Sequence, residues 1–167
     1  NPEPLKHCIY YEKEWLDTVS EEEIISDINF LKSKYMTRTR WYKIGGKPVV
    51  FVYNTTPTAH EGEDPEYQQT LTQKWNSVRQ QTGIYTVLKV WSGWESYKSY
   101  SNSWHQYGPS TAYQAHKPYS SYISPGWWAA YEDSPRLARN PTTFEANARI
   151  MKADGCALHT IQTWNEW

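Results

Sequence analysis

Three segments of the chain repeat apolar residues at helical spacing. Ser20 and Glu23 form a capping box at the start of the first segment. The other two start at Asp64-Pro65 and Asn140-Pro141, where a polar N-cap precedes a proline at the first helical position, and each ends at a glycine. The pattern therefore predicts three amphipathic helices. Their apolar stripes are Ile24, Ile28, Leu31 and Tyr35, then Tyr67, Leu71, Trp75 and Val78, then Phe144, Ala148 and Met151.

Strand-like runs alternate with these helices. Pro48–Asn54 and Ile84–Trp91 are almost continuously apolar and rich in Val, Tyr and Ile, which is typical of parallel strands covered on both faces. Three further runs are His7–Glu12, Tyr122–Pro125 and Cys156–Glu166. The resulting order predicts an α/β fold with a parallel sheet, in a single domain spanning residues 1–167.

The stretch 92–122 interrupts this alternation and is crowded with Tyr, Trp, Ser and Asn. Long loops inside a domain are usually functional or disordered, and so many rings argue against disorder. The two interpretations left are a platform on which a ligand stacks and a packing cluster over the edge of the sheet.

Composition narrows the classes of function. The 167 residues carry 17 Lys and Arg against 18 Asp and Glu, and this near-neutral balance lacks the basic patch of a nucleic-acid-binding protein. No apolar run approaches the ~20 residues that a membrane span needs. Aromatic residues make up 16% of the chain, and rings of this kind suit a ligand with flat, hydroxyl-rich faces. The composition therefore favours carbohydrate as the partner.

Cofactor and metal chemistry have little support in the sequence. The acidic segment from His60 to Glu66 lacks a recognisable ligand spacing, so we expect neither a metal nor a cofactor. Cys8 and Cys156 either pair or are two small buried residues. Asn54-Thr55-Thr56 is a glycosylation sequon and gives weak support for an extracellular or secreted protein.

Polar and aromatic residues converge where the predicted strands end, and in parallel α/β folds the chemistry lies beyond those carboxyl ends. Alternation turns Leu88 and Ile161 toward the helices. It places Lys89 and Trp91 on the face opposite Leu88, and Gln162, Trp164 and Glu166 on the face opposite Ile161. The candidate sugar-binding residues are Tyr10, Tyr53, Lys89, Trp91, Trp104, His105, Tyr107, Trp127, Trp164 and Asn165.

Two glutamates at strand ends are the candidate catalytic residues. Glu166 stands between tryptophans, where desolvation would raise its pKa toward general acid/base use. It could instead be a structural carboxylate paired with Lys89 or an arginine. Glu12 is the second candidate, and its alternative role is that of a solvated surface residue. His105 could donate to a sugar hydroxyl or be an ordinary loop histidine.

The strand ends also carry a family resemblance. The segment 46–54 (GKPVVFVYN), followed by the closing Thr163-Trp164-Asn165-Glu166-Trp167, resembles glycoside hydrolase families 99 and 71, with bacterial xylosidase/arabinosidase-like and WbsX-type relatives. The resemblance implies a (β/α)8 barrel, of which about five or six strands would be present as a C-terminal part. It also implies that Glu166 assists the 2-hydroxyl of the sugar and that a second glutamate follows three residues later, beyond Trp167.

Two hypotheses of different classes follow. One is a glycoside hydrolase acting on a poly- or oligosaccharide, and the other is a non-catalytic carbohydrate-binding or structural protein on a truncated barrel. A glycosyltransferase accessory role is a third and more remote interpretation. An unclosed barrel exposes sheet edges, so we expect either the rest of the barrel or a second copy to cover them.

Overall fold

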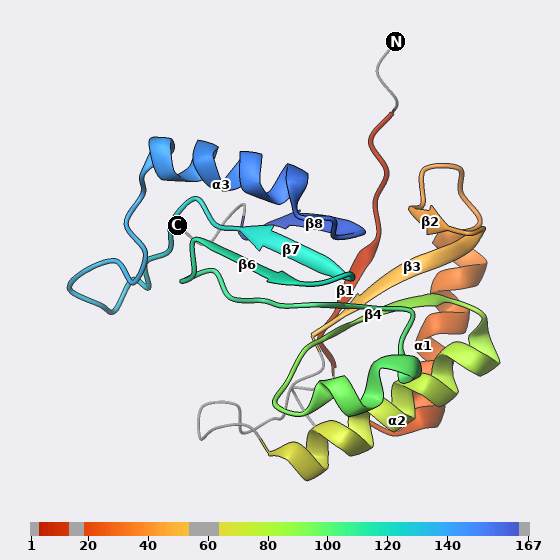
Figure 1. Ribbon diagram of the computed structural model, residues 1–167. Coiled ribbons are helices and arrows are strands. Elements are labelled where there is room, and N and C mark those ends of the chain that lie inside the picture. Colours follow the sequence, from red (N-terminus) through yellow and green to blue (C-terminus); the bar gives the residue numbers. More distant parts are fainter. Residues whose placement is uncertain (1–3, 14–18, 54–63, 164–167) are drawn as a thin grey trace. The chain divides into compact units, whose positions relative to one another are not determined.

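The computed structural model describes residues 4–13, 19–53 and 64–163, and the chain divides into two compact units, Asn1–Ser103 and Trp104–Trp167 (Figure 1). The first unit is an α/β unit with parallel strand pairing, as predicted. The barrel part of the expectation remains a prediction.

The first unit is built on a sheet whose strand order is β1-β3-β4-β5. β1 pairs with β3, and β3 with β4, in parallel, while the short β2 pairs antiparallel with β3. The elements from β1 to β5 are β1 (Ile9–Tyr11), α1 (Glu21–Leu31), η2 (Lys32–Met36), β2 (Lys43–Ile44), β3 (Lys47–Val52), α2 (Pro65–Thr82), β4 (Tyr85–Lys89), η3 (Trp94–Tyr100) and β5 (Ser103–His105). Of β5, only Ser103 belongs to the first unit by the division above.

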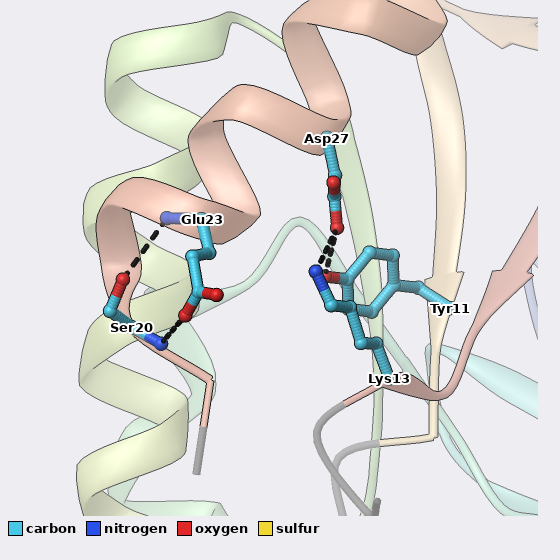
Figure 2. A network of polar contacts seen from close by, with 5 residues as sticks. All are labelled: Tyr11, Lys13, Ser20, Glu23 and Asp27. Atoms are coloured by element: carbon cyan, nitrogen blue, oxygen red, sulfur yellow. Dashed lines mark hydrogen bonds and ion pairs between the residues drawn. The ribbon is translucent and has the colours of Figure 1, made fainter. Parts of the chain in front are cut away.

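Both helices of this unit begin at the predicted caps. The Ser20 hydroxyl accepts from the Glu23 N–H at 3.1 Å, and the Glu23 carboxylate accepts from the Ser20 N–H at 2.9 Å (Figure 2). This carboxylate has a lowered pKa because of the backbone hydrogen bond from Ser20. The Asp64 side chain caps α2, which ends at Gly83 with a φ of 71°. Capping by residues that are close in sequence therefore determines where both helices begin and where α2 ends.

The predicted stripe of α1 holds only over its first turns. Ile24 and Ile28 are fully buried, but Tyr35 is 40% exposed. The reason is the π-helical turn η2, which follows α1 directly and shifts the helical phase.

Tyr11 connects β1 to both helices. Its ring meets Trp75 of α2 edge-on, with centroids 5.2 Å apart. Its hydroxyl donates to Asp27 of α1 at 2.9 Å, and Lys13 reaches the same carboxylate oxygen at 3.1 Å (Figure 2). One side chain thus supplies apolar contact to α2 and a hydrogen bond to α1.

The second unit contains β6 (Tyr113–His116), β7 (Ser120–Ile123), α3 (Pro141–Ala153) and β8 (Leu158–Ile161). β6 and β7 form an antiparallel pair, and β8 joins β7 in parallel. α3 begins at its predicted N-cap, Asn140, and packs against β6 and β7.

Two expectations for this part of the chain are wrong. The stretch 92–122 is not one loop, since it contains η3, β5 and β6. Its serines and tyrosines support strands once neighbours pair with them. Ile161 is 54% exposed and does not lie under a helix, because α3 covers β6 and β7. Gln162, directly after β8, is buried, and its side-chain oxygen accepts from the Gly108 N–H at 2.7 Å.

A polar cluster joins the end of α3 to this sheet. The Asp154 side chain is only 2% exposed and accepts from the Tyr113 hydroxyl at 3.1 Å and the Cys156 N–H at 2.8 Å, with His159 Nε2 at 3.3 Å. Burial by itself raises the pKa of this carboxyl. Polar hydrogens on Ser121, Cys156 and Tyr113 stabilise the ionised carboxylate and so lower the pKa. Their effect is larger than that of burial, and the pKa of Asp154 therefore lies well below its usual range.

We expect Tyr11→Phe to lower the free energy of unfolding by about 1.5 kcal/mol, because it removes a hydrogen bond to a carboxylate and keeps the ring. Lys13→Met is the control, since it breaks only an exposed ion pair and should cost less than about 1 kcal/mol. Urea unfolding compares the two variants. Equal losses would contradict the role given to the tyrosine hydroxyl.

We expect Asp154→Asn to cost about 1–3 kcal/mol at pH 7, because buried donors lose a charged acceptor. The folded pKa of Asp154 lies below the unfolded value of about 3.9, so the ionised group stabilises the fold above that pH. This contribution disappears as the pH falls toward the folded pKa.

Urea unfolding of Asp154→Asn from pH 7 down to pH 3 should therefore show its gap from the wild type narrowing. The exposed Asp133→Asn is the matched control and should change little. A gap that is the same at every pH would exclude a charge-dependent role for Asp154.

Candidate functional site

Three aromatic rings and a lysine gather at the carboxyl ends of β1, β3 and β4 in the first unit. The Tyr10 ring stacks on Phe51 with centroids 6.4 Å apart and planes 18° apart. Tyr10 also lies 6.1 Å from the Tyr53 ring. The Lys89 ammonium sits 4.4 Å from the centroid of the Tyr53 ring, a cation–π contact. We call these four residues the strand-end cluster.

The register of the sheet produces this cluster. Tyr10 is opposite Phe51, and Phe51 is opposite Val87, so the three side chains share one face. Lys89 is two residues beyond Val87 and points to that same face. The ladder continues past β3, because the Tyr53 N–H donates to the Tyr11 carbonyl at 2.9 Å.

The opposite face is the one that the helices cover. Tyr11, Val52 and Leu88 are register partners there, and all three are buried. The strand-end cluster instead keeps accessible surface, since Tyr10 is 37% exposed and Tyr53 and Lys89 are partly exposed. Its rings and ammonium can therefore meet a ligand.

A hollow of about 610 Å³ lies in the same unit, between the first turns of α2 and the segment that follows β4. Trp91 and Tyr97 line it with ring centroids 5.5 Å apart, and Glu66 and Gln69 supply an acid and an amide. Rings beside hydrogen-bonding side chains are suited to a hydroxyl-rich ligand. The other lining residues are Pro65, Thr70, Ser92 and Gly93.

Trp91 does not share the face of Lys89, so the predicted orientation is wrong. Its indole N–H donates to the Thr72 hydroxyl of α2 at 3.2 Å, and both residues are buried. β4 ends at Lys89, so strand alternation no longer determines the direction of Trp91. Arg79 of α2 donates to the carbonyls of Ser99 and Tyr100 and so holds the end of η3 that follows Tyr97.

Several predicted site residues lie elsewhere. Trp104 and His105 have 0% and 2% exposure, so they pack in the interior. Tyr107 and Trp127 are partly exposed, and Glu12 is exposed directly after β1. Trp164, Asn165 and Glu166 lie outside the described residues, and their predicted roles remain predictions.

Phe51 of the strand-end cluster and the residues that line the hollow, except Trp91, were not among the predicted site residues. Phe51 could have been found, because it is two residues before Tyr53 and so on the same face of the strand. Tyr97 and Glu66 belong to the hollow only through the packing of η3 on α2. No local pattern in the sequence signals that packing.

Cys8 and Cys156 are both free thiols. Burial raises the pKa of the Cys8 thiol. Within residues 4–13, 19–53 and 64–163, no three His, Cys, Asp or Glu side chains are grouped to hold a metal ion. Nor does that part of the chain contain a helix long and apolar enough to cross a membrane.

Comparison with known proteins identified no relative. No protein-family model matches the chain, and neither the curated proteins nor the solved structures contain a significant match.

Proposed function

We propose that this protein binds carbohydrate at the strand-end cluster and hydrolyses a glycosidic bond of a poly- or oligosaccharide. The observation that carries the binding part is the pairing of the partly exposed Tyr10 and Tyr53 rings with the Lys89 ammonium on one face of the sheet. Aromatic faces cover the apolar faces of a sugar, and an ammonium donates to its hydroxyls.

The neighbouring hollow supports the same ligand class. Glu66 and Gln69 offer planar acceptors and donors that can pair with adjacent hydroxyls, and Tyr97 adds a ring. Such a combination of few polar groups with aromatic walls is common in small-molecule sites.

The hydrolytic part rests on the sequence. Glycosidases use two carboxyl groups, one as an acid and the other as a base or nucleophile. The closing Trp-Asn-Glu-Trp segment resembles that of glycoside hydrolases, so we assign Glu166 as one carboxylate. Glu12 is the second candidate that this chain offers.

We expect Tyr53→Ala to weaken binding of an oligosaccharide by about tenfold, because the ligand loses one aromatic face and Lys89 loses its support. Tyr131→Ala is the matched control, since Tyr131 is 83% exposed and lies in the other unit. Isothermal titration against a panel of neutral and acidic oligosaccharides measures both. If the two variants bind equally well, the strand-end cluster is not the binding site.

We expect Glu166→Gln to abolish release of reducing sugar and to leave binding within about twofold of the wild type, because the amide keeps the shape and removes the ionisable group. Reducing-end analysis by chromatography and titration of the same preparation give the two readouts. If the wild type binds the oligosaccharide but does not cleave it, the hydrolase proposal is wrong and the alternative, a non-catalytic carbohydrate-binding protein, takes its place.

A further inference from the structure

The second unit has a hollow of its own in the segment that joins β7 to α3. Its volume is about 390 Å³, and its lining is mainly apolar, with two indoles and a single guanidinium. The lining residues are Trp127, Trp128, Pro135, Leu137, Ala138 and Arg139. Neither the strand-end cluster nor the hollow beside α2 includes any of these residues.

Hydrogen bonds hold this segment in shape. Trp127 and Leu137 exchange two backbone hydrogen bonds of 2.9 and 3.1 Å. The Arg136 guanidinium lies 4.7 Å from the centroid of the Trp127 ring and forms an ion pair with Glu132. The hollow is therefore preformed, which lowers the entropic cost of binding.

Trp128 lines this hollow with a half-exposed side chain. The ring is 52% exposed, yet its N–H donates to the Glu132 carbonyl at 2.8 Å. A large exposed ring held in one orientation by its polar edge is suited to stacking on a ligand.

Arg139 provides the charge. Among the described residues that line the hollow, it is the one with an ionised side chain. Gly126, with a φ of 145°, lets it approach, because a Cβ there would come within 2.7 Å of Arg139 Cγ. The glycine thus places the arginine stem against the backbone of the hollow. An arginine and an indole that line the same hollow complement a ligand with a carboxylate and an apolar face.

We propose that this hollow is a second glycan-binding site that takes an acidic sugar, with the pyranose ring of a hexuronate on Trp128 and its carboxylate on Arg139. The choice of carbohydrate rests on the proposed function. The hollow has room for one or two sugar rings, since small-ligand sites begin at about 300 Å³.

Titration with trigalacturonate and with its neutral methyl ester tests the proposal. Two-dimensional NMR of the indole N–H groups follows Trp128 itself, because its resonance is identified by its absence in Trp128→Ala. We expect the wild type to bind the acid about tenfold more tightly than the ester, the gain from one charged hydrogen bond. Arg139→Gln should abolish this preference, whereas the exposed Arg149→Gln should keep it.

Trp128→Ala should lower the affinity for both ligands by about tenfold, while Tyr131→Ala in the same segment should leave them within about twofold. Trp128→Phe should bind more tightly than Trp128→Ala, because it keeps an aromatic ring. Such a recovery would show that a substitution at this position leaves the fold intact. All titrations are repeated in the Tyr53→Ala variant. This variant weakens the strand-end cluster only, so the binding that remains reports on the second site. Loss of all binding in Tyr53→Ala would overturn the second site and leave the first.

Equal affinity of the wild type for acid and ester would refute the proposal, as would equal behaviour of the two arginine variants. Binding that survives Tyr53→Ala but not Trp128→Ala would support the second site and contradict the strand-end cluster as the main one. A Trp128 resonance that shifts with an acidic peptide and not with trigalacturonate would mean a protein partner and would also refute it.

Discussion

The parallel register of β1, β3 and β4 is the constraint on which the first unit depends. Tyr11, Val52 and Leu88 fall in one row on the helix-covered face, and Tyr10, Phe51 and Val87 fall in the next row on the other face. A slip of one residue in any strand would exchange these sets, and the helices would then cover the polar rings. The same register that buries the core therefore places Tyr53 and Lys89 together.

Tyr11 connects this register to both helices. A phenylalanine would pack against Trp75 equally well, but only a tyrosine also reaches the Asp27 carboxylate. Tyr11 therefore uses its ring for contact with α2 and its hydroxyl for the hydrogen bond to α1. Local signals cooperate with it, since the caps of α1 and α2 fix where each helix begins and so which residues face the sheet.

The sequence predicted those parts of the structure that depend on neighbours along the chain. Caps, stripes and alternation are short-range, so all three helices, the parallel strands β1, β3 and β4, and the meeting of Tyr10, Tyr53 and Lys89 could be anticipated. The hairpin of β6 and β7, the packing of η3 on α2 and the turn of Trp91 toward Thr72 arise from tertiary contacts. Serine and tyrosine carry no strong preference for strand or loop until such contacts form.

Aromatic content alone is a poor guide to the ligand. Trp75 and Trp104 are fully buried, and Trp91 and Trp94 nearly so, which makes much of the tryptophan part of the packing. The rings on which the proposed sugar binding depends are instead those that remain accessible and have a polar partner. They are Tyr53 under Lys89 in one unit and Trp128, bonded to the Glu132 carbonyl, in the other. Ordering such rings before a ligand arrives reduces the entropy lost on binding, so that more of the free energy gained from each stacked ring contributes to the affinity.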